Sequence, residues 1–283
     1  MKHITSLFTF SDKTSIPYYE FPVKPTTNKV LLCIHGITSD LEHLFIMAEN
    51  IRSNVRIDIH IPILRGYTSF EEGKGDIKRK GIYDQDLIEM IDELSKEYEE
   101  IYLLGHSMGA GNILRYYLNT PSEKIINIFL VAPFINPSMK VFHDKNDDQS
   151  DDLYEIFFKR AVFLGLLDRL KIGFLSHLPV VKIPLREIPY DTSSKTISYT
   201  LSFRLMISRF VSNLAIIKRL PIERIHIFIG ENDEVIHGKK FKDYWEKEVG
   251  NETNLLEELD HNSVLTSEEF TRKMAAIIRH VSN

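Results

Sequence analysis

The stretch Glu100–Leu118, EIYLLGHSMGAGNILRYYL, decides the fold. Its apolar opening, Glu100–Gly105, is typical of a strand buried on both faces in a parallel sheet. The spacing of apolar residues over Met108–Leu118 predicts a helix. Between them lies GHSMG, residues 105–109, a Gly-x-Ser-x-Gly pattern that ordinary residue frequencies would produce about 0.1 times in a chain of this length. The succession of strand, glycine-flanked serine and helix predicts a sharp turn that presents the side chain of Ser107.

The residues around Ser107 favour a nucleophile held on a strained turn. Gly105 and Gly109 leave room for the turn to approach a neighbouring strand and helix. The helix that begins there directs N–H groups toward any negative charge nearby. A serine hydroxyl also needs a base to remove its proton, usually a histidine that a carboxylate positions. The other interpretation of the pattern is a glycine-rich turn with an incidental serine.

Outside this stretch, strands and helices alternate along the chain. The expected strands are Ile4–Phe10 and Ile16–Val23, which form an opening hairpin, then Lys29–His35, Val55–Leu64, Lys124–Ala132, Arg224–Ile229 and Asn254–Leu259. The other expected helices are residues 40–52, 82–98, Gly238–Val249 and Ser267–His280. This alternation predicts the α/β class, with a mostly parallel sheet of about eight strands and helices on both faces.

The alternation breaks over residues 135–210, which predicts a helical cap insertion at the carboxyl edge of the sheet. Residues 1–134 and 211–283 are then the N-terminal and C-terminal parts of the α/β core. The insertion opens with an acidic run, Asp144–Asp152, which fits a solvated loop or a site for the amino group of a peptide substrate. Apolar segments such as YEIFFKRAVFLGLLDRL follow. They fit helix packing, an acyl-binding wall or a membrane-facing patch.

The carboxylate should follow the serine along the chain and lie at the end of a late strand. Ligands and catalytic groups collect at the carboxyl ends of strands in open α/β sheets. Asp233, in IFIGENDEVI after the strand Arg224–Ile229, meets both conditions and is the predicted acid. Glu231 and Glu234 lie close enough to be mistaken for it, and aspartate after asparagine is also common in plain turns.

In this class of α/β fold, the histidine that acts as base follows the acid along the chain. The chain has 11 histidines, so position decides among them, and His261 lies between the last expected strand and the last expected helix. The alternative for His261 is a histidine of a surface loop. Asp260 beside it is a second possible carboxylate, although adjacent residues of an extended segment point to opposite faces.

Cleavage of an acyl bond places negative charge on the former carbonyl oxygen, which N–H donors must stabilise. The backbone N–H of the residue after the nucleophile, Met108, is one expected donor. The second should come from the loop after the strand Lys29–His35, where the sequence continues Gly36-Ile37-Thr38. We expect the N–H of Ile37 to complete this oxyanion hole. The alternative for the His35-Gly36 pair is a turn that only ends the strand.

Composition excludes several classes of protein. A net charge of −5 gives no electrostatic reason to expect nucleic acid as a partner. The single cysteine, Cys33, excludes an intramolecular disulfide scaffold. No signal-peptide pattern and no apolar run of transmembrane length are present, so a cytoplasmic protein is expected. The spacings of histidines and cysteines suit no metal site, and no phosphate-binding glycine loop is found, so neither a metal nor a cofactor is expected.

With these residues located, the chain resembles the α/β-hydrolase superfamily, nearest its lysophospholipase and monoacylglycerol-lipase-like branch. The resemblance covers nearly the whole chain and rests on His35-Gly36, residues 105–109, the turn from Gly230 through Asp233 to Ile236, and His261. The loop Arg65-Gly66, followed by Gly75-Asp76, is also similar to that branch. Two features depart from that branch. Asp260 stands where the branch usually has a glycine just before its catalytic histidine. The Arg-Gly-x-Gly-x-Ser loop of the branch is shortened here to Arg65-Gly66-Tyr67-Thr68-Ser69.

The resemblance implies a cofactor-free serine hydrolase that cleaves a carboxylic ester through an acyl-enzyme. The expected partner is a small-molecule ester, and the apolar insertion favours a medium or long acyl chain. The same three residues, Ser107, Asp233 and His261, would also serve a thioesterase or an aminopeptidase. A non-catalytic ligand-binding receptor of this fold is the alternative from another class. The sequence specifies no oligomeric state.

Overall fold

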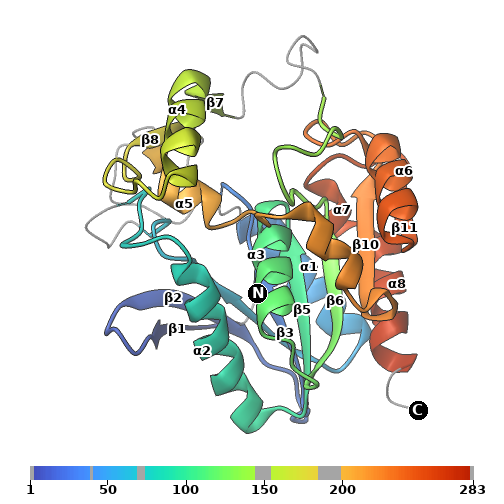
Figure 1. Ribbon diagram of the computed structural model, residues 1–283. Coiled ribbons are helices and arrows are strands. Elements are labelled where there is room, and N and C mark those ends of the chain that lie inside the picture. Colours follow the sequence, from blue (N-terminus) through green and yellow to red (C-terminus); the bar gives the residue numbers. More distant parts are fainter. Residues whose placement is uncertain (1–2, 39–40, 69–73, 144–153, 184–198, 281–283) are drawn as a thin grey trace.

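The computed structural model describes residues 3–38, 41–68, 74–143, 154–183 and 199–280. Its core is an eight-stranded sheet with the order β1-β2-β4-β3-β5-β6-β10-β11 (Figure 1). The strands are β1 (Ile4–Thr9), β2 (Ser15–Phe21), β3 (Lys29–Ile34), β4 (Asp58–Pro62), β5 (Glu100–His106), β6 (Ile125–Val131), β10 (Ile225–Gly230) and β11 (Thr253–Leu256). Pairing is antiparallel from β1 to β2 and from β2 to β4, and parallel across the rest of the sheet. The predicted fold class is confirmed.

Helices cover both faces of this sheet (Figure 1). They are α1 (Leu41–Asn54), α2 (Ile82–Glu97), α3 (Met108–Asn119), α6 (Gly238–Val249), α7 (Ser263–Thr266) and α8 (Glu268–His280). Side chains of β3 alternate between two cores because successive residues of a strand point to opposite faces. Val30 and Leu32 pack with α2, α3 and α6, whereas Leu31 and Cys33 pack with α1, α7 and α8. Burial on both faces explains the continuous apolar runs of the central strands.

Element boundaries differ from the expected ones by a few residues, with local causes. The fourth strand covers only Asp58–Pro62 because Val55 still donates its N–H to Ile51, in the last turn of α1. The last strand ends at Leu256, earlier than expected. Glu258 follows with a positive φ of 61°, which is incompatible with an extended ladder.

Within the described residues, the insertion between β6 and β10 contains strands as well as helices, which corrects the expectation of a helical insertion. It contains β7 (Glu155–Ile156), α4 (Phe158–Arg169), β8 (Pro179–Ile183), β9 (Tyr199–Ser202) and α5 (Phe203–Ile207), followed by the short 3-10 helices η1 (Leu214–Arg219) and η2 (Ile222–Arg224). Strands β7, β8 and β9 form a separate three-stranded sheet. Two adjacent buried valines, Val180 and Val181, favour a strand over a helix in this part of the insertion. The division at residues 134 and 210 remains a prediction, and the acidic run Asp144–Asp152 lies outside the described residues.

The insertion is joined to the core through the loop that precedes α2. Ser202 donates its backbone N–H to the carbonyl oxygen of Gly75 at 2.7 Å. A Cβ atom at Gly75 would lie 1.7 Å from the carbonyl oxygen of Thr200, so only glycine permits this approach. An ion pair between Lys80 and Asp168 of α4, at 2.7 Å, adds a second connection.

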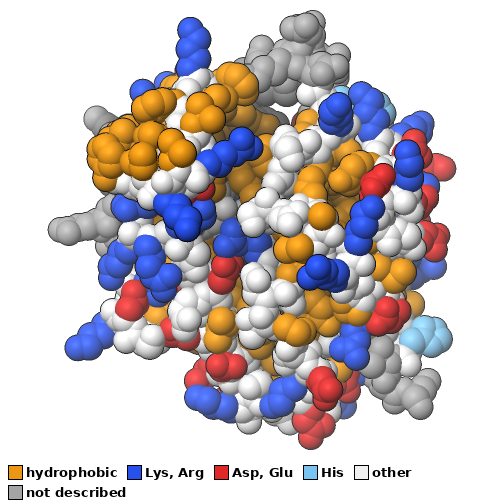
Figure 2. Space-filling view, in the orientation of Figure 1, with side chains coloured by type: hydrophobic (Ala, Val, Ile, Leu, Met, Phe, Trp, Pro, Cys, Tyr) orange, Lys and Arg blue, Asp and Glu red, His pale blue; other side chains and the backbone are white. Residues whose placement is uncertain are grey.

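Apolar side chains gather on the outer surface of the insertion (Figure 2). The exposed ones on α4 and the turn after it are Phe158, Val162, Phe163, Leu166, Leu170, Ile172 and Phe174. Within the described residues, helix packing does not account for them, so the acyl-wall and membrane-facing interpretations remain predictions. Among the helices of the described ranges, none has both the length and the apolar character of a membrane span.

Candidate active site

Ser107 occupies a strained turn between β5 and α3. Its φ of 52° and ψ of −121° lie in a region that costs a non-glycine residue about 1–3 kcal/mol. Three backbone hydrogen bonds hold the turn: the Ser107 N–H donates to Val131, and the Ser107 carbonyl accepts from Ala110 and Phe134. Strain that the surroundings support in this way is typical of functional positions.

Close backbone packing explains the glycines on both sides of the serine. A Cβ atom at Gly105 would lie 2.5 Å from the backbone nitrogen of Ala110, and one at Gly109 would lie 2.1 Å from the carbonyl oxygen of Ile34. Both distances are far below van der Waals contact, so larger residues would displace α3 from the sheet. The glycines of residues 105–109 therefore allow α3 to approach β3 and β5 closely.

Asp233 lies in the loop after β10 and is 1 % exposed. Its Oδ1 accepts the N–H groups of Val235 at 2.8 Å and Ile236 at 2.7 Å, which fixes the carboxylate. Its Oδ2 accepts the Nδ1–H of His261 at 2.8 Å. The structure therefore brings the predicted acid and the predicted base into direct contact.

The competing carboxylates have other partners. Glu231 pairs with Lys239 at 2.7 Å. Oδ1 of Asp260 accepts the backbone N–H groups of Asn262 and Ser263, which directs this carboxylate along its own loop. Glu234 accepts the backbone N–H of His261 at 3.0 Å and so contacts the main chain of the histidine rather than its ring.

His261 lies between β11 and α7, with its side chain 9 % exposed. Burial opposes protonation of this imidazole, but the carboxylates of Asp233, Glu234 and Asp260 outweigh burial and raise its pKa above the ordinary value. Donation from Nδ1 to Asp233 leaves Nε2 as the nitrogen that can accept a proton from another group.

His106 connects His261 to the turn of Ser107. Its Nε2–H donates to the carbonyl oxygen of His261 at 3.0 Å, and the two rings lie 5.1 Å apart. Because His106 immediately precedes Ser107, this contact brings His261 close to the Ser107 turn. Ser107, Asp233 and His261 all follow strands at the carboxyl edge of the sheet, as the sequence predicted.

The predicted oxyanion loop lies beside the serine. A Cβ atom at Gly36 would be 3.1 Å from Cβ of Ser107. The buried His35 ring holds this loop, since its Nδ1–H donates to the Gly36 carbonyl at 2.7 Å and its Nε2 accepts the N–H of Leu64 at 3.0 Å. Burial and the charge of Arg209 lower the pKa of His35 to about 3, so the ring stays neutral. Met108, the other predicted donor, is the first residue of α3.

Residues of the segment after β6 hold the loop of Asp233 in place. His143 donates its Nε2–H to the carbonyl oxygen of Asp233 at 2.9 Å. His237 donates its backbone N–H to Val141 at 2.8 Å, and the rings of His143 and His237 stack at 5.1 Å. These contacts fix the backbone of the loop that carries Asp233.

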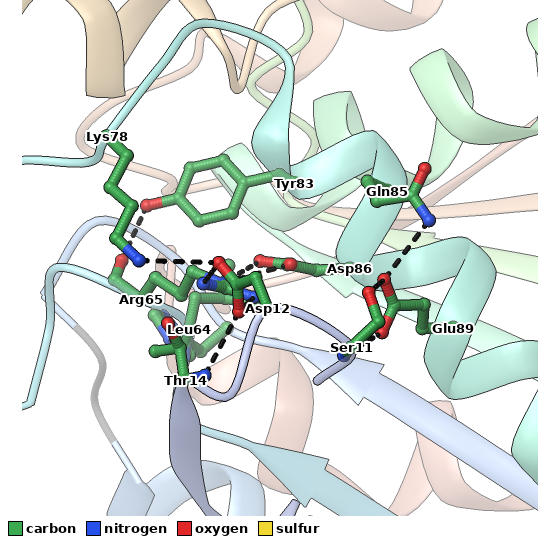
Figure 3. Close-up of polar contacts among 11 residues, drawn as sticks. Ser11, Asp12, Thr14, Leu64, Arg65, Lys78, Tyr83, Gln85, Asp86 and Glu89 are labelled. Atoms are coloured by element: carbon green, nitrogen blue, oxygen red, sulfur yellow. Dashed lines mark hydrogen bonds and ion pairs between the residues drawn. The ribbon is translucent and has the colours of Figure 1, made fainter. Parts of the chain in front are cut away.

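An ionic network centred on the buried Arg65 and Asp86 supports the loop that begins at Arg65 (Figure 3). Nε of Arg65 donates to both oxygens of Asp86 on α2, at 3.0 and 2.9 Å, and its terminal nitrogens reach Asp12 in the β1–β2 turn at 2.8 and 3.0 Å. Tyr83 donates its hydroxyl to the Arg65 carbonyl at 2.7 Å. The next residue, Gly66, accepts the N–H of Gly75 at 2.7 Å, which brings together the two loop segments that resemble the family. Ser69 lies outside the described residues.

Sequence reasoning missed Arg209, which is fully buried beside this site. It follows α5 and donates hydrogen bonds to the backbone carbonyls of His35 and Gly36. An arginine inside the apolar run LMISRFV was the available signal, because arginine is almost never fully buried without a partner. Within the described residues, no cluster of three or more histidine, cysteine or acidic side chains could hold a metal ion.

Comparison with solved structures shows the same fold elsewhere. A soluble variant of monoglyceride lipase from Saccharomyces cerevisiae matches with a TM-score of 0.69 and 15 % identity, over 99 % of this chain and 95 % of that one. A putative aryl esterase from Burkholderia cenocepacia matches with a TM-score of 0.65 and 14 % identity, over 99 % and 100 % of the two chains. A thioesterase domain from the curacin biosynthetic pathway matches with a TM-score of 0.56 and 14 % identity, over 99 % and 100 %. At these identities the likeness is one of fold.

Sequence comparison gives the family. None of the curated proteins is a significant match to the sequence. The family model described as the alpha/beta hydrolase fold matches residues 29–178, which is more than half of the 283-residue chain. The matched range includes the loop after β3 and the turn of Ser107. The chain therefore belongs to the alpha/beta hydrolase fold family.

Proposed function

We propose that this protein is a serine hydrolase that cleaves a carboxylic ester, with Ser107 as nucleophile, His261 as base and Asp233 as acid. One observation carries the proposal: the buried Asp233 carboxylate accepts the Nδ1–H of His261 at 2.8 Å, and His261 in turn contacts His106, which precedes the strained Ser107. A carboxylate in this position keeps the proton on Nδ1 and stabilises the imidazolium that forms during the reaction.

The reaction proceeds in two steps that share one base. Nε2 of His261 takes the hydroxyl proton of Ser107 as Oγ bonds to the ester carbonyl carbon. The tetrahedral intermediate then expels the alcohol, which receives that proton from His261, and the acyl group remains on Ser107. Water next gives a proton to His261 and attacks the acyl-enzyme, which releases the carboxylic acid and restores the serine hydroxyl.

The backbone N–H groups of Ile37 and Met108 are the proposed oxyanion donors. Loss of one such donor in another enzyme costs about 2.7–4 kcal/mol of transition-state stabilisation. Support comes from the contact of Gly36 with Ser107 and from the position of Met108 as the first residue of α3. The first N–H groups of a helix have no partner within the helix, and they favour negative charge.

For the substrate, we propose an ester with an apolar acyl chain, as in the lysophospholipase and monoacylglycerol-lipase-like branch. The apolar surface of the insertion supports this substrate class. The fold of a monoglyceride lipase over nearly the full length of both chains is consistent with it.

A substrate panel tests the proposal. Wild type and the Ser107→Ala variant are assayed with p-nitrophenyl esters of increasing chain length, acyl-thioesters and aminoacyl arylamides. We expect ester turnover by wild type and a loss on the order of 10⁶ in kcat for Ser107→Ala. Ser53→Ala, which removes an exposed hydroxyl from α1, is the matched control and should retain full activity.

The other outcomes assign the alternatives. Turnover of thioesters or arylamides alone would replace the ester assignment by a thioesterase or an aminopeptidase. A folded wild type that turns over none of these compounds would replace it by the receptor alternative.

A further inference from the structure

Arg209 is a fully buried cation, and its hydrogen-bond acceptors among the described residues are neutral. Its Nε donates to Oδ1 of Asn112 at 2.8 Å. One terminal nitrogen donates to the Gly36 carbonyl at 3.0 Å and to the Tyr67 hydroxyl at 2.6 Å, and the other donates to the His35 carbonyl. Burial of a charge is expensive, and neutral acceptors leave its positive field uncancelled. A position of this kind therefore needs an explanation beyond packing.

We propose that Arg209 is a positioning residue for the oxyanion hole: it holds the Gly36–Ile37 peptide in the orientation that directs the Ile37 N–H at the reacting carbonyl oxygen. This inference rests on the proposed hydrolase function. The reason lies in the shape of the peptide unit. In a trans peptide, the C=O and the following N–H point in opposite directions and lie in one plane. A donor that fixes the Gly36 carbonyl oxygen therefore also sets the direction of the Ile37 N–H.

Two donors hold that carbonyl oxygen from the side opposite to the N–H. They are Nδ1 of His35 at 2.7 Å and the guanidinium of Arg209 at 3.0 Å. Hydrogen bonds to a peptide carbonyl polarise the unit, which strengthens its N–H as a donor. The contact between Gly36 and Ser107 places this peptide next to the nucleophile.

The same side chain connects this loop to the helix that supplies the other donor. Asn112 belongs to α3, whose first residue is Met108. A Cβ atom at Gly111 would lie 2.2 Å from the Arg209 carbonyl oxygen, so the backbone of Arg209 also rests directly on α3. One guanidinium thus sets the spacing between the two proposed donors, which belong to segments far apart in the chain.

The charge of Arg209 acts in the same direction. A cation in a low-dielectric environment favours negative charge that develops nearby, and it does so most strongly in the transition state. It also disfavours protonation of His35, whose pKa lies at about 3, so that Nε2 of His35 remains an acceptor for the N–H of Leu64.

The test compares Arg209→Met and Arg209→Lys with Arg115→Met. Arg115 is a matched control because it donates to the carbonyls of Ile207 and Phe210, on either side of Arg209, and to Asp84 rather than to the oxyanion loop. For Arg209→Met we expect kcat to fall about 10²–10³-fold, the cost of one oxyanion donor, with KM changed less than about threefold. Arg209→Lys keeps the charge but cannot reach all four acceptors, so we expect a loss of at least about tenfold.

A second measurement separates positioning from stability. A trifluoromethyl ketone forms a tetrahedral oxyanion on an active serine, whereas the product carboxylic acid does not. In the Arg209 variants the ketone should bind more weakly in proportion to the loss of kcat, while product inhibition stays constant. Arg115→Met should lower the melting temperature without changing either inhibition constant. If Arg209→Met does not fold, the same ratios measured on Arg209→Lys decide the question.

The inference is overturned if folded Arg209 variants keep kcat and ketone affinity within twofold of wild type. It is also overturned if Arg115→Met loses both to the same extent. A wild type that turns over no acyl compound would instead overturn the proposed function, so the two failures are distinguishable.

Discussion

Replacement of Asp233 by asparagine tests how the buried carboxylate acts, because it removes the charge and keeps the shape. Oδ1 of Asp233 accepts two backbone N–H groups, from Val235 at 2.8 Å and Ile236 at 2.7 Å. The amide oxygen of the variant must stay on these donors. The reversed orientation would leave two buried N–H groups facing an NH2, at about 1–3 kcal/mol for each unpaired group.

The orientation of the amide then determines the tautomer of His261. The NH2 group of the variant points at Nδ1, which accepts a hydrogen bond only when it carries no proton. The ring proton therefore moves to Nε2, and Nε2 can no longer take the proton of Ser107. By analogy with other triads we expect kcat to fall on the order of 10⁴, equivalent to about 5.5 kcal/mol of activation free energy.

The assay is ester hydrolysis at saturating substrate, with the melting temperature as the control for folding. Asp260→Asn is the matched variant, because Asp260 is exposed and its Oδ1 binds Asn262 and Ser263. We expect its kcat to stay within about threefold of wild type, as is usual for a surface substitution. An Asp233→Asn enzyme within tenfold of wild type, or a 10⁴-fold loss in Asp260→Asn instead, would refute the assignment of the acid.

The site and its supporting contacts lead to three more expected outcomes. Activity should fall as the pH drops below the raised pKa of His261, because the base must be neutral. Glu234→Gln removes one charge that raises this pKa, so the acidic side of its pH profile of kcat/KM should move to lower pH. An unmoved profile would mean that Glu234 does not raise the pKa of His261. Gly36→Ala places a Cβ atom 3.1 Å from Cβ of Ser107, so kcat should fall about 10–100-fold with little change in melting temperature. An unchanged kcat would exclude close packing of the Gly36 loop on Ser107. Arg65→Met leaves the buried Asp86 without its cation, so chemical denaturation should show a loss of about 3–5 kcal/mol in the free energy of unfolding. A loss below about 1 kcal/mol would mean that the ionic network of Arg65 contributes little to stability.

The parts of the site that depend on local sequence could be predicted. The Ser107 turn is contained in consecutive residues, since β5, the glycine-flanked serine and α3 follow one another without a gap. The proximity of Asp233 and His261 could be predicted from their places after late strands, because parallel strands deliver their carboxyl ends to one edge, whereas their roles as acid and base remain proposals. The two-core arrangement also follows from the doubly buried runs of the central strands.

The parts that depend on distant contacts could not be predicted. Strand β7 has two residues and forms only by pairing with Val181 and Lys182, far along the chain, so no local pattern marks it. The proposed role of Arg209 depends on four acceptors in three separate segments: the adjacent His35 and Gly36, Tyr67, and Asn112. Its sequence neighbours indicate only that it interrupts an apolar run.

Covalent labelling reports on the activation of Ser107 without any choice of substrate, because a fluorophosphonate reacts with an activated serine and leaves a stable adduct. Wild type and Ser107→Ala are incubated with the probe, and the modified peptide is identified by mass spectrometry. We expect one adduct on Ser107 in wild type and none in the variant. Absence of labelling in folded wild type, or an adduct on another residue that persists in Ser107→Ala, would contradict the assignment of Ser107 as the nucleophile.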